Sequence, residues 1–180
     1  KGHFQLRDPL SRFIPAFGEA KVRIAGELTA VTDSLEEPRR PIQLRDMLTH
    51  TAGLANNYIG DVAAYRTHMT QPRPKNNAEQ IARLASFPLN YHPGEEWQYS
   101  SATSVVGHLA EIISGQSLDV FLEENLFKPL DMKDTHFYLD DTKGGRLTTQ
   151  YTPGEDNKIT PQDPGDKESR WITSERSIFS

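Results

Sequence analysis

Residues 92–115 read HPGEEWQYSSATSVVGHLAEIISG and place a Pro-Gly turn and two aromatic residues directly before the strongest helical pattern of the chain. Apolar side chains recur there at helical spacing and form one stripe, which contains Val105, Val106, Leu109, Ile112 and Ile113. Gly115 stands where a left-handed C-cap is expected. The sequence therefore predicts a helix over 101–114, with Tyr99 just before its entrance.

Other parts of the chain also carry helix signals. Apolar periodicity and breakers predict a helix from Pro41 to Leu48, a helical turn over 62–69, and helices over 77–87 and 117–127. Asn77 is expected to cap the third of these, in a capping box with Gln80. Four apolar residues of the last are expected to face inward: Leu118, Phe121, Leu122 and Leu126.

The remaining segments predict a mainly α protein with short β pieces. Candidate strands are VRIA (22–25), LTAVT (28–32) and THFYL (135–139). We expect one incomplete domain over 1–180, made of an extended arm (1–40), a helical core region (41–139) and a polar, turn-rich tail (140–180). Only 36% of residues are apolar, below the roughly 45–50% of typical globular domains, so another segment is expected to complete the core.

Charge and composition exclude several classes of protein. The net charge of −5 gives no electrostatic footprint for nucleic acid. No apolar run approaches the roughly 18 residues that a membrane span needs. The chain has no cysteine, which excludes disulfides, thiolate metal sites and a cysteine nucleophile. Lys1 is not Met and no signal peptide is visible, so upstream sequence is expected and both a cytoplasmic and an exported location stay open.

No metal or cofactor is expected. The six histidines never stand three or four residues apart, and the clusters Asp131–Asp134 and Asp140–Asp141 lack the glycine and glutamate of an EF-hand loop. Gly-rich phosphate loops are absent. Gly115-Gln116-Ser117 starts like a nucleophile elbow but follows a helix, which favours a capping role for Ser117. No serine is followed by lysine at the third position, so a Ser-x-x-Lys nucleophile is also absent.

Trp97 and Tyr99 alternate on a segment that is expected to be extended, and two interpretations are open. Both rings could pack beneath the following helix, which we expect for Trp97. Tyr99 differs because it lies directly before the helix N-terminus, where unpaired N–H groups and the helix dipole favour negative charge. An ionised phenol would also need positive neighbours, and this stretch contains none. Residue chemistry alone makes Tyr99 a candidate general base.

Three blocks of sequence together resemble the serine β-lactamase-related family, which includes class C β-lactamases, DD-peptidases and β-lactamase-like family VIII esterases. They are KGHFQLRDPLSRFIPAF (1–17), PIQLRDMLTHTAGL (41–54) and the stretch 88–138, which contains Pro-Gly-x-x-Trp-x-Tyr-Ser. The resemblance implies the helical region of a β-lactamase/transpeptidase-like α+β fold that lacks most of the antiparallel sheet domain.

The resemblance also implies roles for two residues. Tyr99 stands at the family's Tyr-x-Asn motif, where the tyrosine moves a proton to and from a nucleophilic serine. Ser101 takes the place of the asparagine, which contacts substrate. Because serine cannot make the same amide contact, we expect ester hydrolysis rather than β-lactam hydrolysis, on a small ester or amide (β-lactam-like) substrate. His50 is expected to be a structural loop residue.

The family's Ser-x-x-Lys motif and Lys-Thr-Gly-type strand are both missing from these residues. We therefore expect an internal fragment of a serine hydrolase, inactive alone and partnered by the remaining segments of the same enzyme. The alternatives are a catalytically inactive scaffold or binding protein of the same fold, and a freestanding helical module that binds a protein partner.

Overall fold

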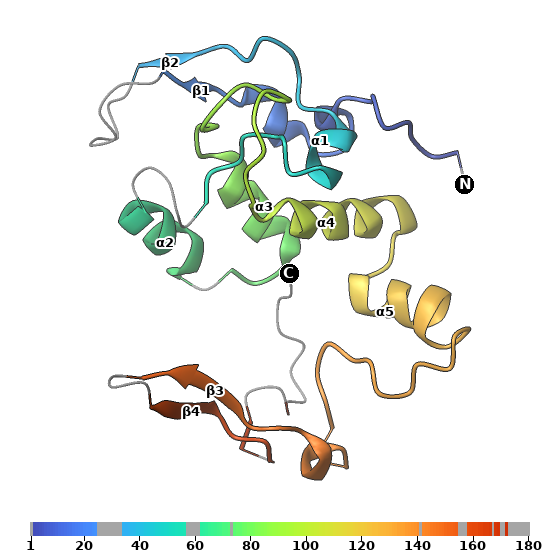
Figure 1. Cartoon of the computed structure of the whole chain (residues 1–180). Helices are drawn as coiled ribbons and strands as arrows, with labels where there is room; N and C mark the ends of the chain where they lie inside the picture. Colours follow the sequence, from blue (N-terminus) through green and yellow to red (C-terminus); the bar gives the residue numbers. More distant parts are fainter. Residues whose placement is uncertain are drawn as a thin grey trace. The chain divides into compact units, whose positions relative to one another are not determined.

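The computed structural model describes residues 2–24, 34–56, 62–72, 74–140, 142–154, 158–166, 168–169 and 172. The chain divides into two compact units (Figure 1). The first unit contains Lys1–Phe121 and the second contains Leu122–Ser177. The candidate strand LTAVT (28–32) lies outside the described residues.

The first unit is mainly helical. Its elements are the 3₁₀-helices η1 (Leu10–Arg12) and η2 (Pro15–Glu19), the strands β1 (Val22–Arg23) and β2 (Leu35–Glu36), and the helices α1 (Leu44–Leu48), α2 (Val62–Thr70), α3 (Asn77–Ala85) and α4 (Ala102–Ser114). Strands β1 and β2 pair antiparallel, with Val22 opposite Glu36. Val22 also forms a parallel bridge with Leu89, which joins the segment before α4 to this small sheet.

Helix α4 confirms the strongest helix prediction. Val105 and Leu109 are buried, and Val106 and Ile113 pack against the core. Ile112 is exposed, so the buried stripe is narrower than the apolar pattern. Gly115 adopts φ 70° and donates its N–H to the carbonyl of Glu111, as expected for a left-handed C-cap.

The hydrophobic core lies where α4 packs against α1 and α3. Helix α2 packs on α3, and η2 also contacts α3. The largest buried apolar side chains come from the N-terminal segment, from α1, α3 and α4, and from the loops between them: Leu10, Val22, Met47, Leu54, Ile81, Leu84, Leu89 and Val105. Burial of this apolar surface is the main term that stabilises the first unit.

The N-cap of helix α3 lies one residue earlier than the sequence predicted. Asn76, not Asn77, is the N-cap, and its side chain accepts a hydrogen bond from the Glu79 N–H at 2.9 Å. Asn76 has the extended backbone that an N-cap needs, with φ −161° and ψ 171°. Asn77 is already helical, and its side-chain amide donates to a carboxylate oxygen of Glu111 on α4 at 3.1 Å.

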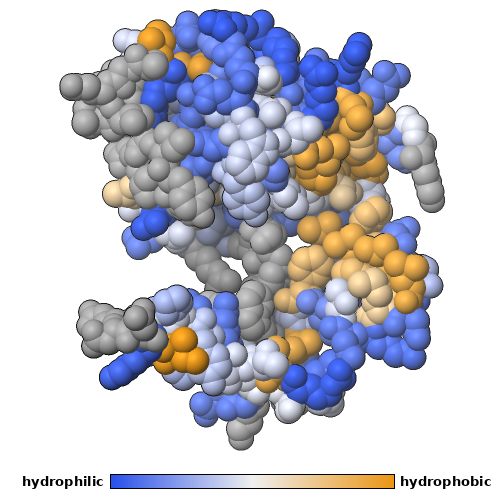
Figure 2. Space-filling model, viewed as in Figure 1, coloured by the Kyte–Doolittle hydropathy of each residue, from blue (hydrophilic) through white to orange (hydrophobic). Residues whose placement is uncertain are grey.

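The helix predicted over 117–127 is divided. Helix α5 (Leu118–Leu122) continues as a π-helical turn, η3 (Glu123–Phe127). The wider π turn breaks the 3.6-residue period, so Leu126 does not continue the expected inward face and is exposed. Leu118, Phe121 and Leu122 are only half-buried, and Figure 2 shows apolar residues gathered on the surface around α5. The inward-facing prediction was wrong for Leu126, whereas the other three residues are partly buried and Leu118 lies beside Gly107 of α4.

The second unit contains an antiparallel hairpin that the sequence did not predict. Strands β3 (Gln150–Pro153) and β4 (Ile159–Asp163) pair after the short 3₁₀-helix η4 (Gly144–Arg146). Both strands are mostly exposed, which explains why they lack an alternating apolar pattern. The predicted strand THFYL (135–139) is wrong except for a single bridge from Leu139 to Ile172. Turn hydrogen bonds, such as that from the Thr135 N–H to the Met132 carbonyl, occupy its start.

Helix α1 provides a matched pair of core and surface residues. Met47 and Leu48 are neighbouring apolar residues, but Met47 is 1% exposed and Leu48 is 57% exposed. We expect Met47→Ala to lower the free energy of unfolding by about 2–5 kcal/mol, because it leaves a cavity. Leu48→Ala should change it by less than about 0.5 kcal/mol. Urea unfolding measures both, and equal losses would contradict the burial pattern.

Candidate active site

Two loops of the first unit meet side by side: residues 49–56 after α1, and residues 88–101 before α4. Three main-chain hydrogen bonds join them, from the N–H of Asn90 to the carbonyl of Gly53 (2.7 Å), from Gly94 to Thr51 (2.7 Å), and from Gln98 to His50 (3.0 Å). The side-chain amide of Asn90 also donates to the side-chain oxygen of Gln98 at 2.9 Å. The two motif blocks of the sequence therefore form one local structure.

Glycine is needed where the two loops touch. Gly53 has φ 77°, and a Cβ atom there would lie 2.2 Å from the carbonyl oxygen of Tyr91. A residue with a side chain would push the loops apart as well as strain the backbone. The sequence suggested Gly53 only as a helix stop, but the structure gives it this second reason.

An ion pair at the start of α1, between Arg40 and the buried Asp46, supports the same loops. The Arg40 guanidinium donates to both carboxylate oxygens of Asp46, at 2.6 and 2.9 Å. Asp46 also accepts the Gln43 N–H in the capping box of α1. The hydrogen bonds to Asp46 raise the pKa of the Arg40 guanidinium. Gly94 lies directly over this pair, since a Cβ there would be 2.1 Å from Nη2 of Arg40.

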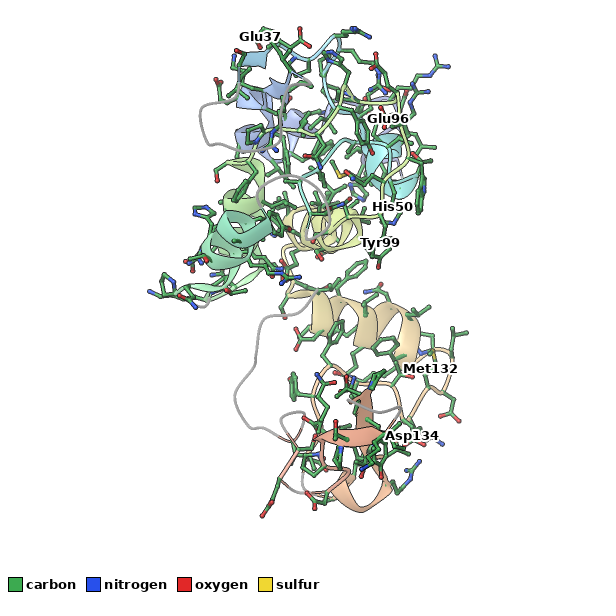
Figure 3. The ribbon with its side chains drawn as sticks, turned by 60° about the vertical axis from the view of Figure 1, so that its left-hand side comes forward. Glu37, His50, Glu96, Tyr99, Met132 and Asp134 are labelled. Carbon is green, nitrogen blue, oxygen red and sulfur yellow. The ribbon has the colours of Figure 1, made fainter. Side chains whose placement is uncertain are left out.

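Tyr99 is at the end of this paired segment, two residues before Ser101, the N-cap of α4. Its side chain is 61% exposed. The buried side chain of Asn56 donates to the Tyr99 carbonyl at 2.9 Å. The Tyr99 ring lies against the His50 ring, with centroids 4.9 Å apart and planes tilted by 30°. Figure 3 shows these two labelled side chains next to each other.

Trp97 is 68% exposed, so the prediction that it anchors the core was wrong. The reason is that successive side chains of an extended segment point to opposite sides. Gln98 turns toward Asn90, and the residues on either side of it, Trp97 and Tyr99, face the other way. Trp97 makes an edge-on contact with the His50 ring, at a centroid distance of 6.3 Å.

Ser101 is the N-cap of α4, but its side chain makes no capping hydrogen bond. The side chain lies near the buried Tyr65 of α2, whose pKa is raised by burial and lowered by this neighbour. The Ser101 carbonyl accepts the N–H groups of Ser104 and Val105, which begins the helix. The structure therefore brings the two predicted site residues, Tyr99 and Ser101, to the same helix entrance.

The loop contains a second tyrosine, Tyr91, in a different environment. Burial, and then the Glu96 carboxylate, raise the pKa of Tyr91 to about 12. Its hydroxyl lies 3.5 Å from the carbonyl oxygen of His50. At neutral pH this phenol is held protonated, which suits a donor and not a base.

His50 was expected to be a structural loop residue. The structure adds that both exposed aromatic residues of the loop contact its ring. Periodicity could not reveal this, because His50 lies outside the helices. In the described part of the chain, no group of three or more His, Asp or Glu side chains could hold a metal ion. Among the same residues, no helix is long and apolar enough to cross a membrane.

The raised pKa of Tyr91 gives a direct test of this loop. Because the folded pKa is above that of a free tyrosine, the stabilisation from the neutral phenol should be present below about pH 10 and lost as the pH rises toward about 12. An absorbance titration at alkaline pH should contain one component near pH 12 that Tyr91→Phe removes. A titration that the substitution leaves unchanged would contradict the burial of this phenol.

Comparison with known proteins connects this geometry to a family. A family model described as Beta-lactamase matches residues 1–176. Protein Rv1367c of Mycobacterium tuberculosis is 30% identical over 159 residues, which are 88% of this chain and 39% of that protein. Esterase EstB of Burkholderia gladioli is 27% identical over 168 residues, 91% of this chain and 39% of the esterase.

A solved structure shares the fold. The hydrolase EstCE1, described as having promiscuous acyltransferase activity, is 25% identical with a TM-score of 0.62. The match covers 89% of this chain and 39% of EstCE1. The chain thus spans about two fifths of the length of these relatives. The match to part of a β-lactamase-like fold, predicted from the sequence, is confirmed.

Proposed function

Because the chain belongs to the beta-lactamase family, we propose that it forms part of a serine hydrolase that cleaves esters through an acyl-enzyme. Tyr99 acts as general base and general acid for a nucleophilic serine outside these 180 residues. Ser101 contacts the substrate. The substrate is a small ester, and the partners of this chain are the remaining segments of the same enzyme.

The observation that carries the proposal is the placement of the Tyr99 phenol. It is mostly exposed, directly before the N-terminus of α4, and its carbonyl is fixed by the buried Asn56. Tyr91, the other tyrosine of the loop, is held protonated by burial and by Glu96. Of the two, Tyr99 is the one that a reacting group can reach.

The proposed chemistry has two steps. The serine oxygen attacks the ester carbonyl while the Tyr99 phenolate takes the hydroxyl proton, and the proton then passes to the departing alcohol. In the second step Tyr99 takes a proton from water, the water oxygen attacks the acyl carbonyl, and the proton returns to the serine. Tyr99 ends each cycle in its starting state.

Ester substrates are favoured over β-lactams for two reasons. Ser101 stands where the resemblance implies asparagine, and a hydroxyl cannot make both hydrogen bonds of an amide. Among the relatives, EstB is described as an esterase and EstCE1 as a hydrolase with promiscuous acyltransferase activity.

The 180-residue chain alone should not turn over p-nitrophenyl butyrate above the buffer rate, because the proposed nucleophile is not in it. Release of p-nitrophenol followed by absorbance is the measurement, with the chain carrying Tyr99→Phe as the comparison. Turnover by the chain that this substitution abolishes would show that the catalytic groups are already complete.

In the complete protein that contains this chain, Tyr99→Phe should lower kcat/KM for p-nitrophenyl butyrate by roughly 10²–10⁴-fold, the usual contribution of a general base. Tyr151→Phe is the matched control, because Tyr151 is an exposed tyrosine on β3. It should leave kcat/KM unchanged. A Tyr99→Phe variant within twofold of the wild type would remove the role assigned to Tyr99.

The alternative is a catalytically inactive scaffold or binding protein with this fold, and Ser101 in the place of asparagine is what favours it. The reading frame upstream of Lys1 distinguishes the two. A Ser-x-x-Lys motif within it supports the enzyme, and its absence supports the scaffold.

A further inference from the structure

His50 has a backbone conformation that few residues adopt. Its φ is 54°, in the left-handed region, where asparagine, aspartate and histidine are enriched among residues with side chains. The carbonyl of His50 accepts the Gln98 N–H at 3.0 Å. The backbone of His50 is therefore fixed to the same segment that carries Tyr99.

The imidazole of His50 contacts both exposed aromatic rings of that segment. Its centroid lies 4.9 Å from the Tyr99 ring and 6.3 Å from the Trp97 ring, within the range of aromatic pairs. With a tilt of 30°, the His50 and Tyr99 rings are closer to parallel than to perpendicular. Since most of Tyr99 is exposed, the His50 ring is a protein surface that restricts the rotation of the phenol.

The ring nitrogen Nδ1 of His50 is buried and forms no hydrogen bond among the described residues. A histidine that served mainly as a hydrogen-bond donor or acceptor would be expected to satisfy this atom, because an unpaired buried nitrogen is costly. The stabilising contacts of the His50 side chain therefore come from its planar ring and not from Nδ1.

We propose that His50 is a positioning residue, whose ring stacks on Tyr99 and holds the phenol oxygen in the geometry that proton transfer needs. The proposal rests on the proposed function of Tyr99. Together with the bond from Asn56 to the Tyr99 carbonyl, the stack fixes this residue at both its main chain and its ring. Proton transfer is sensitive to such placement, because a small displacement of the reacting atom costs much of the rate.

The test compares two substitutions in the complete protein. His50→Asn removes the ring and keeps a residue that tolerates positive φ, so kcat for p-nitrophenyl butyrate should fall roughly 10–100-fold with KM unchanged. His50→Phe restores a planar ring without nitrogens and should recover most of the lost kcat. The matched control is His68→Asn, because His68 contacts the Phe87 ring at 5.2 Å, away from Tyr99.

A double-mutant cycle separates positioning from a general loss of structure. If His50 acts through Tyr99, then His50→Asn should have no further effect on kcat in a Tyr99→Phe background. Equal losses in the two backgrounds would overturn the proposal. So would wild-type kcat in His50→Asn. A loss in His50→Phe as large as that in His50→Asn would also overturn it when the free energy of unfolding of His50→Phe matches that of the wild type, because strain at the positive φ is then excluded.

A structural measurement decides the ring contact independently of catalysis. Nuclear Overhauser effects between the ring protons of His50 and Tyr99 should be present in the wild-type protein, and His50→Phe should retain an equivalent contact. Their absence would overturn the positioning role. If the contact is present but Tyr99→Phe leaves activity unchanged, the proposed function fails while the stack stands, so the two failures are distinguishable.

Discussion

The hydrogen-bonded pairing of the loop after α1 with the loop before α4 is the constraint on which the rest of the site depends. Three main-chain hydrogen bonds hold the two loops together, and one of them joins Gln98, the neighbour of Trp97 and Tyr99, to His50. The pairing sets the alternation that turns Gln98 inward and Trp97 and Tyr99 outward. Without Gly53 the two main chains could not approach closely enough to form it.

The Arg40–Asp46 pair adds a charged support to this arrangement. One carboxylate caps α1 and binds the guanidinium that lies against Gly94, so the start of α1 and the Pro-Gly turn are fixed together. The Asp46 side chain is almost fully buried. Losing Arg40 would leave the buried Asp46 carboxylate without its charged partner, a change that typically costs about 3–5 kcal/mol.

The sequence predicted the features that depend on local pattern. Helix α4 and its Gly115 cap follow from periodicity and from the conformational freedom of glycine. The predicted burial of Trp97 was wrong. Its hydrophobicity suggested a core position, but the hydrogen bond between Gln98 and Asn90 turns Gln98 inward and leaves the neighbouring Trp97 exposed. The contact of His50 with Tyr99 joins residues far apart in the sequence. Only tertiary pairing of two loops creates it, so no pattern within either loop could have revealed it.

The two tyrosines of the loop, Tyr91 and Tyr99, lie in different environments, and only Tyr99 suits the proposed role of a base. A phenol serves as a base only when positive charge stabilises its anion. In the segment 92–101 around Tyr99, His92 is the single residue that can carry positive charge. His92 is buried and pairs with Glu36. Under the proposed function, this chain contributes the position of Tyr99, through Asn56 and His50, and the positive charge that activates the phenol would come with the nucleophile. Position and activation would then be separable in such an enzyme.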